Sequence, residues 1–167
     1  QNEASSIWSE YQPVFLSNCE RLHATRPTAV NLRNALQAIR RQSEEWPPKT
    51  PMLEIKKKIL NFAQQLEKSD LETCQAIGLN GAKIFTHSNL RVMTHCNTGS
   101  LATAGYGTAL GVIRSLQKKA QLEHVYVDET RPYLQGSRLT AFELAAEGIP
   151  YSIQTDSAAA YLMKHER

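Results

Sequence analysis

The chain has 167 residues, of which 41% are hydrophobic and 21% are charged, as in ordinary globular domains. Its net charge is +3, and its 19 basic residues are spread over both halves. A nucleic-acid-binding protein more often gathers its basic residues on one stripe beside stacking aromatics, so we expect no nucleic-acid partner. No apolar run approaches the roughly 18 residues of a membrane span, so we expect no membrane partner either.

The three cysteines, Cys19, Cys74 and Cys96, are widely separated and form no CxxC pair. A sparse, odd set of cysteines is typical of a reducing compartment and argues against a disulfide framework. No signal-peptide pattern precedes the first helical segment, so we expect the protein in the cytoplasm, or also in the nucleus of a eukaryote. The first residue is not methionine and the last helical pattern is short, so we expect a longer protein around this chain.

The first part of the chain is predicted to be helical. Residues 28–41 place apolar side chains on one face of a helix, and Pro27 suits its first turn. Residues 46–51 contain three prolines and predict a linker. A second helix follows over residues 55–66, and a capping-box pattern at Ser69 predicts the start of a third helix that runs towards residue 85.

The pattern changes after residue 88. Strands are predicted at residues 90–95, 124–128 and 151–155, and helices at residues 100–122, 139–147 and 157–164. Strands that alternate with helices at this spacing indicate right-handed crossovers and a parallel sheet. The predicted fold class is therefore α/β: a helical N-terminal segment at residues 1–88, followed by a Rossmann-like βαβαβα portion at residues 89–167, each a partial domain.

Polar or small residues follow each predicted strand, and in an open parallel sheet ligands bind outside the carboxyl ends of the strands. The loops at residues 94–99, 128–132 and 155–157 are therefore expected to share one rim, which is the predicted site. The candidate rim residues beside the cysteine discussed next are Asn97, Thr98, Gly99 and Asp156.

Cys96 is the most distinctive residue of this rim. We expect it at a strand end, just before a glycine-rich helix N-terminus, where free N–H groups and the helix dipole would favour a thiolate or bind a phosphate. A small cysteine packed against the sheet is the alternative that its position leaves open. Cys19 and Cys74 lack such a setting and are expected to be packing residues. Adjacent strand residues point to opposite faces, so His95 is expected to be buried rather than paired with Cys96.

Two further residues could bind a phosphorylated sugar. Arg26 precedes a predicted helix start and could clamp a phosphate, although a solvated surface arginine is the simpler interpretation. Gln135 could exchange hydrogen bonds with sugar hydroxyls, or it could be a capping or loop residue. The histidines and cysteines lack metal-ligand spacing, and no nucleotide-binding glycine motif is present, so neither a metal nor a cofactor is expected.

Several long motifs are similar to those of the methylthioribose-1-phosphate isomerases. They are Thr-Arg-Pro-Thr-Ala-Val-Asn-Leu at residues 25–32, Thr-His-Cys-Asn-Thr-Gly-Ser-Leu at residues 94–101, Val-Asp-Glu-Thr-Arg-Pro-Tyr-Leu-Gln-Gly-Ser-Arg-Leu at residues 127–139, and Thr-Asp-Ser at residues 155–157. The resemblance extends from about Arg21 to the end of the chain and is strongest beyond residue 90.

The resemblance implies a homodimeric enzyme with a helical N-terminal domain and a Rossmann-like domain. It implies interconversion of the aldose 5-methylthioribose 1-phosphate and the ketose 5-methylthioribulose 1-phosphate in methionine salvage. In the family the residue matching Cys96 is catalytic, and those matching Arg26 and Gln135 contact the substrate. The family's catalytic aspartate lies in a Gly-x-Asp-Arg motif beyond residue 167, and an Arg-Gly-Ala-Pro block and an Asn-Lys pair also lie outside this chain. The 167 residues alone are therefore expected to be inactive.

Two alternatives to this function remain open. A ribose-1,5-bisphosphate isomerase shares the reaction type, so only the choice of sugar would separate the two enzymes. The regulatory subunits of translation initiation factor 2B share the fold without being isomerases, but their pattern lacks the cysteine motif. Asp156 could replace the missing aspartate, but the family carries an aspartate at this position in addition to the catalytic one, so we expect a loop or helix-cap role for it.

Overall fold

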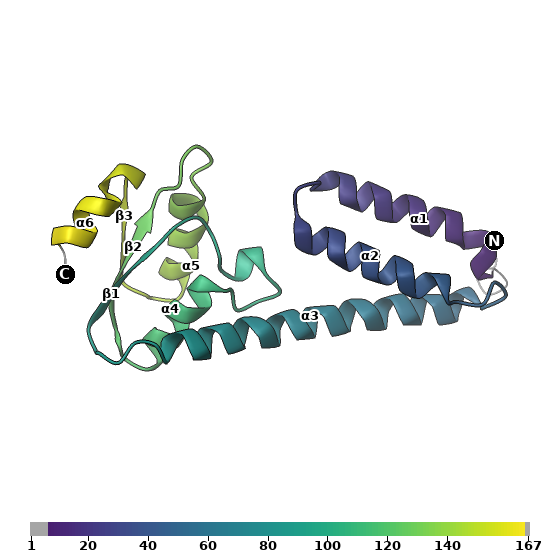
Figure 1. The fold of residues 1–167 in the computed structure, drawn as a ribbon, viewed down its shortest axis with the longest axis horizontal. Helices are drawn as coiled ribbons and strands as arrows, with labels where there is room; N and C mark the ends of the chain where they lie inside the picture. The colour runs from purple at the N-terminus through teal and green to yellow at the C-terminus, as the bar shows by residue number, and fades with distance from the viewer. Residues whose placement is uncertain (1–6, 166–167) are drawn as a thin grey trace. The chain divides into compact units, whose positions relative to one another are not determined.

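The computed structural model describes residues 7–165 and divides into two compact units, one up to Leu66 and one from Glu67 onward (Figure 1). The change from helices to alternating strands and helices lies between the end of α3 at Ala82 and the start of β1 at Leu90. Each unit has its own apolar cluster, so the two are described separately.

The first unit contains α1 (Trp8–Thr25), α2 (Val30–Glu44) and the beginning of α3 (Met52–Ala82). Three aromatic rings form the centre of its core: Trp8 meets Phe15 at 5.4 Å and Trp46 at 5.0 Å between centroids, both edge to face. The linker predicted at residues 46–51 is confirmed, and it supplies Trp46 to this core. The helix start predicted at residue 28 is wrong, because residues 26–29 form a turn closed by the Ala29 N–H on the Arg26 carbonyl.

The helix break predicted at Ser69 is wrong. α3 continues through this position, and the Ser69 carbonyl accepts a hydrogen bond from Thr73 Oγ1 one turn later, as in a helix interior. The neighbouring Asp70 directs its carboxylate to the backbone N–H of Ala104, 2.8 Å away in a distant loop. The local signal for a cap is thus overridden by a tertiary contact.

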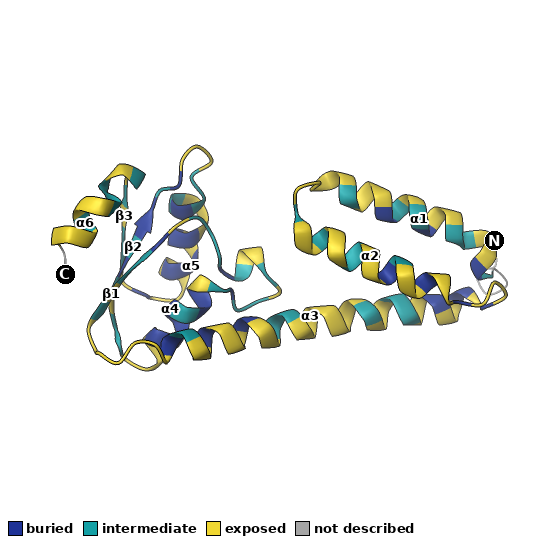
Figure 2. Cartoon of the chain, in the orientation of Figure 1, coloured by how far each residue is buried: buried dark blue, intermediate teal, exposed yellow. Residues whose placement is uncertain are grey.

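The second unit confirms the α/β prediction with a three-stranded parallel sheet in the order β1 (Leu90–Thr94), β2 (Leu122–Asp128), β3 (Tyr151–Gln154). Figure 1 shows α4 (Ala109–Lys118) and α5 (Ala141–Ala146) on one side of this sheet and α6 (Ala159–His165) on the other. The buried residues of the core come from α4, β2, α5 and the turn after α5 (Figure 2): Leu110, Ile113, Val125, Val127, Leu144 and Ile149.

The prediction of a helix over residues 100–122 is wrong at both ends. A short 3-10 turn, Ser100–Ala102, is followed by a loop, and α4 begins only at Ala109 and ends at Lys118. The loop folds back because Gly107 adopts a left-handed backbone with φ 81° and the Thr108 N–H donates to the Thr98 carbonyl. Leu122, the last residue of the predicted helix, is the first residue of β2.

The second crossover begins with a π-helical turn, Gly136–Thr140, that leads into α5. The predicted end of this helix at Gly148 is confirmed, since Gly148 has φ 65° and closes the segment with its N–H on the Ala145 carbonyl. The strand and helix predicted after it correspond to β3 and α6, with α6 starting after a 3-10 turn at residues 156–158.

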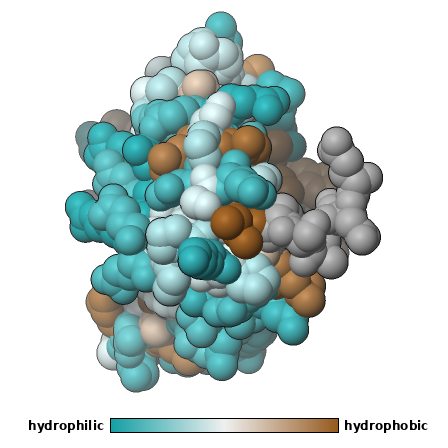
Figure 3. Space-filling view, turned by 90° about the vertical axis from the view of Figure 1, so that its right-hand side faces the viewer, coloured by the Kyte–Doolittle hydropathy of each residue, from teal (hydrophilic) through white to brown (hydrophobic). Residues whose placement is uncertain are grey.

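The face of the molecule drawn in Figure 3 is mostly hydrophilic, with hydrophobic residues in small separate areas. Scattered apolar side chains of this kind are ordinary on protein surfaces. None of the helices within residues 7–165 combines the length and the apolar character that crossing a membrane requires.

Candidate active site

The loops that follow the three strands meet at the carboxyl rim of the sheet, as predicted. The first and second loops are joined by the Cys96 N–H, which donates to Thr130 Oγ1 at 2.8 Å. The second and third are joined by the carboxylate of Asp156, which accepts the N–H groups of Thr130 and Arg131, each at 2.8 Å. Thr130 therefore lies between the other two loops and ties them together.

Cys96 is half-buried and has a left-handed backbone, with φ 63°. This conformation costs a non-glycine residue roughly 1–2 kcal/mol, so tertiary contacts must hold it. The contacts are present on both sides of the residue: the N–H is bound by Thr130, and the carbonyl accepts Thr140 Oγ1 at 2.6 Å. The structure thus fixes the backbone that presents the thiol at the rim.

The prediction of an α-helix N-terminus beside Cys96 is wrong. α4 starts at Ala109, and the N–H groups of Ser100 and Leu101, which would have faced an anion, bind the two oxygens of the Glu143 side chain instead. A resident carboxylate occupies the position that the sequence suggested for a thiolate or a phosphate. The helix-dipole argument for an activated Cys96 therefore does not hold.

Among the acids of the site, Glu143 accepts the most hydrogen bonds, and its side chain is only 4% exposed. Besides the two backbone N–H groups, it accepts Ser100 Oγ at 2.6 Å, Asn97 Nδ2 at 2.8 Å and an Arg114 amino group at 2.8 Å. Burial by itself raises the pKa of Glu143, but the hydrogen bonds from Ser100, Arg114 and Asn97 outweigh it and bring the pKa to about 2. The carboxylate is therefore ionised at neutral pH.

The candidate rim residues after Cys96 are used to hold the loop. Asn97 bonds to Glu143 and, at 3.3 Å, to Thr140. Thr98 Oγ1 accepts the Leu110 N–H at the start of α4. Gly99 is buried against Glu143, and a Cβ atom there would lie well inside 3.0 Å of the carboxylate. Only a glycine fits this close approach.

The prediction that His95 is buried is wrong. β1 ends at Thr94, and the His95 side chain is 60% exposed, with Nδ1 3.0 Å from Oδ2 of the buried Asp128. The other Asp128 oxygen accepts Gln154 Nε2 from β3. As expected, His95 is paired with Asp128 rather than with Cys96.

Among residues 7–165, one group has the spacing of a metal site: ligand atoms of His95, Asp128 and Asp156 lie within 4.8 Å of one another. Both carboxylates already accept hydrogen bonds, Asp128 from Gln154 in β3 and Asp156 from the loop after β2. The pKa of Asp156 is lowered mainly by the backbone N–H groups of Arg131 and Thr130. We treat the trio as part of the hydrogen-bonded rim and assign no metal to it.

The two predicted substrate contacts lie in different units. Gln135 is half-buried at the start of the helical segment that follows the rim loop after β2, directly before Gly136, which packs against the Asp128 carbonyl. Arg26 is exposed at the end of α1 in the first unit. Their roles stay predictions. Cys19 and Cys74 are 5% and 2% exposed, which confirms them as packing residues.

Sequence reasoning missed Glu143, Thr140 and Thr130. Thr130 was within reach, because it stands two residues after the end of β2 in a loop already assigned to the rim. Thr140 and Glu143 lie on the crossover segment, more than 40 positions from the loop they hold. A single acid in a helical segment predicts a surface position, and nothing local to it signals a buried one.

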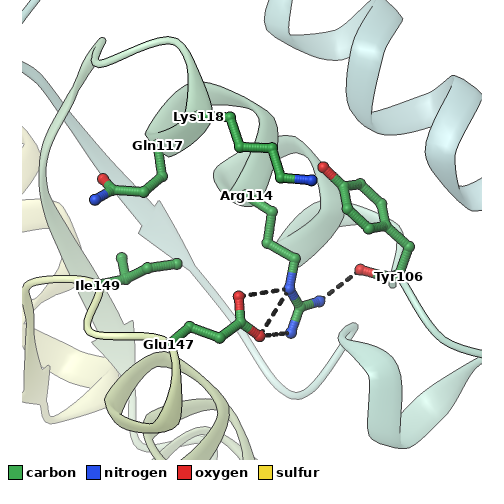
Figure 4. Close-up of a pocket in the computed structure, with 6 residues that line it drawn as sticks. All are labelled: Tyr106, Arg114, Gln117, Lys118, Glu147 and Ile149. Atoms are coloured by element: carbon green, nitrogen blue, oxygen red, sulfur yellow. Dashed lines mark hydrogen bonds and ion pairs between the residues drawn. The ribbon is translucent and has the colours of Figure 1, made fainter.

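One cavity shares Arg114 with this network. It has a volume of about 340 Å³ and is lined by Tyr106, Arg114, Gln117, Lys118, Glu147 and Ile149 (Figure 4). Its cations already have partners: Arg114 is paired with Glu147, and Lys118 Nζ lies 5.1 Å from the centre of the Tyr106 ring. Cys96 is not among its lining residues.

Curated relatives of this chain are named methylthioribose-1-phosphate isomerase. The protein from Nostoc sp. is 49% identical over 167 residues, which cover 96% of this chain and 48% of the relative. The protein from Geobacter sulfurreducens is 46% identical over 146 residues, covering 87% of this chain and 42% of the relative. The chain thus spans about half the length of the curated relatives it matches.

Two crystal structures have similar folds. The 5-methylthioribose 1-phosphate isomerase from Pyrococcus horikoshii is 39% identical with a TM-score of 0.84, covering 94% of this chain and 43% of that one. The delta subunit of translation initiation factor eIF-2B from A. fulgidus is 36% identical with a TM-score of 0.76, covering 94% and 45%. Residues 10–165 match the sequence model of the Initiation factor 2 subunit family. This chain therefore belongs to the Initiation factor 2 subunit family.

Proposed function

We propose that this chain supplies part of the active site of an aldose–ketose isomerase that converts 5-methylthioribose 1-phosphate to 5-methylthioribulose 1-phosphate in methionine salvage. The observation that carries the proposal is Cys96, half-buried at the carboxyl rim and fixed on both sides by Thr130 and Thr140. The names of relatives about half identical to this chain support the reaction and the substrate.

An isomerase of this kind moves hydrogen between C1 and C2 of the sugar. It needs one group near these carbons and another that handles protons on the oxygens. Cys96 would stand near C1 and C2. Because the phosphate blocks the anomeric oxygen, ring opening needs an acid at the ring oxygen, and the family resemblance assigns it to an aspartate beyond residue 167.

Gln135 and Arg26 are proposed to contact the substrate. The position of Gln135 at the helix start after the second rim loop supports hydrogen bonds to sugar hydroxyls, which its amide can both give and accept. Arg26 is proposed to bind the phosphate through its guanidinium fork. Its exposed side chain in the turn before α2 is available to a ligand.

The test is turnover of 5-methylthioribose 1-phosphate by the full-length protein and two cysteine variants. We expect Cys96→Ser to lower kcat on the order of 10²-fold or more, because an alcohol is a poorer acid and nucleophile than a thiol. Cys74→Ala is the matched control: this thiol is buried in α3, so its loss should lower stability and leave kcat within about threefold. Undiminished turnover by Cys96→Ser would contradict the role of the thiol.

Two other functions can be tested beside it. The 36% identical initiation-factor structure favours a non-catalytic binding module, which would bind a translation initiation factor and turn over no sugar phosphate. A ribose-1,5-bisphosphate isomerase would turn over that sugar instead, so titration of both substrates separates the two enzymes.

A cytoplasmic homodimer is proposed from the family resemblance. Light scattering of the full-length protein at micromolar concentration should give twice the chain mass, and cell fractionation should recover the protein with cytoplasmic enzymes. A monomeric mass for a fully active enzyme would rule the dimer out as a requirement.

A further inference from the structure

Glu143 stands out because a buried, ionised carboxylate is expensive unless several donors hold it. Four of its five bonds come from the loop that follows Cys96: Asn97 Nδ2, Ser100 N, Ser100 Oγ and Leu101 N. The carboxylate thus binds the loop much as a bound anion would.

A short chain of contacts links this carboxylate to the cysteine. Asn97 is the next residue after Cys96, and its amide donates both to Glu143 and to Thr140 Oγ1. Thr140 in turn donates its hydroxyl hydrogen to the Cys96 carbonyl at 2.6 Å. Glu143 and Thr140 are three residues apart on one helical segment, so one element bonds both the Cys96 carbonyl and the loop that follows it.

The other side of Glu143 is fixed by Arg114, which is 8% exposed on α4. Figure 4 shows its guanidinium pointing between Glu147 and the carbonyl oxygen of Tyr106, and it bonds both of them. Arg114 therefore has two acidic partners, and of the two it is Glu143 that also bonds the Cys96 loop. This difference makes the two acids a matched pair for an experiment.

We propose that Glu143 is a positioning residue for Cys96, acting through the loop 97–101 to hold the left-handed backbone that presents the thiol. The inference rests on the proposed isomerase function for its kinetic consequence. Its geometric consequence, the accessibility of the Cys96 thiol, does not depend on any substrate.

The experiment compares Glu143→Gln with Glu147→Gln in the full-length protein. A glutamine keeps the size of the side chain, but its amide group can accept at only one atom, so Glu143→Gln releases part of the loop. We expect kcat to fall on the order of 10²-fold with KM within about threefold, since a misplacement near 1 Å can have this effect. Glu147→Gln should leave kcat within about threefold and lower only the melting temperature.

A second readout separates this inference from the proposed function. Alkylation of Cys96 by iodoacetamide, followed by peptide mass spectrometry, should be on the order of tenfold faster in Glu143→Gln than in Glu147→Gln, because the released loop exposes the thiol. If the wild-type protein has no isomerase activity, the function fails and this rate still tests Glu143. Equal alkylation rates in the two variants overturn the inference.

Ser100→Ala covers the case in which Glu143→Gln fails to fold. This change removes one donor to the carboxylate and leaves no buried group of its own unpaired. We expect kcat to fall about three- to tenfold with the cooperative melting transition retained. A kcat equal to that of the wild type would count against the positioning role.

Discussion

Different interactions organise the core of the first unit and the loop that carries Cys96 in the second. The first is organised by aromatic rings, with Trp8, Phe15 and Trp46 in mutual contact and 1%, 7% and 6% exposed. In the second, the loop that carries Cys96 is organised by an ionised carboxylate and its donors. Apolar burial is insensitive to pH and tolerant of small shifts, whereas a buried charge depends on each of its partners. The part proposed for chemistry is thus the part whose geometry depends on ionisation.

The largest expected effect comes from a substitution in the aromatic core of the first unit. Trp8→Ala should cost about 3–5 kcal/mol of unfolding free energy, because it leaves a cavity under Phe15 and Trp46. Urea unfolding followed by the fluorescence of Trp46 reports this unit, since it contains both tryptophans of the chain. Labelling of the buried Cys19 should accelerate, while labelling of Cys74 in the second unit should not.

Val14→Ala is the control for that prediction. Val14 lies on the same helix, α1, but is 49% exposed, so its truncation should change stability by less than about 1 kcal/mol. An equal loss of stability in the two variants would show that the aromatic cluster is not the main source of cohesion in the first unit.

The next largest effect is the dependence of stability on pH that the Glu143 carboxylate causes. Glu143 has a pKa lowered from 4.5 to about 2 in the folded protein, so its stabilising contribution is complete above the unfolded value and is lost as pH falls towards 2. The shift corresponds to on the order of 3 kcal/mol. Thermal melting between pH 6 and pH 2 should therefore show a steeper loss of stability in the wild type than in Glu143→Gln. Parallel pH profiles would contradict this assignment.

The smallest effect concerns two glycines of the second unit. Gly99→Ala should cost about 1–3 kcal/mol, since the new methyl group would collide with the Glu143 carboxylate. Gly148→Ala meets no atom within 4 Å, but its φ of 65° should cost about 1 kcal/mol. Denaturation midpoints give both values. Only Gly99→Ala should change the alkylation rate of Cys96, and an equal change in both would remove the steric explanation.

The strands, their parallel direction and the shared rim could be predicted because they depend on short-range patterns. Alternating or continuous apolar runs followed by polar residues identify each strand end, and parallel topology then brings those ends together. The cysteine-bearing loop was located in this way. The predicted break at Ser69 failed because a capping pattern describes local preference, while the continuous helix depends on tertiary contacts such as the bond from Ala104 to Asp70.

The detailed geometry of the site could not be read from local patterns. The helix expected at residue 100 stops after one 3-10 turn, and the loop that follows folds back at Gly107 before α4 begins at Ala109. The Glu143 carboxylate binds the Ser100 N–H from a position 43 residues away. An acid in an amphipathic helix normally predicts solvent, so its burial is visible only once the fold brings Arg114 and the loop to it. Hydrogen bonds between residues far apart in the sequence leave no periodic pattern, so they could not be predicted.

The backbone angle of Cys96 has a consequence for how this position can vary. A glycine would adopt φ 63° without the strain that any side chain brings there, so replacing the cysteine by glycine relaxes the chain while deleting the sulfur. Stability and reactivity therefore favour different residues at one site. The bonds from the Cys96 N–H to Thr130 and from Thr140 to the Cys96 carbonyl are what offset this backbone strain in the folded protein.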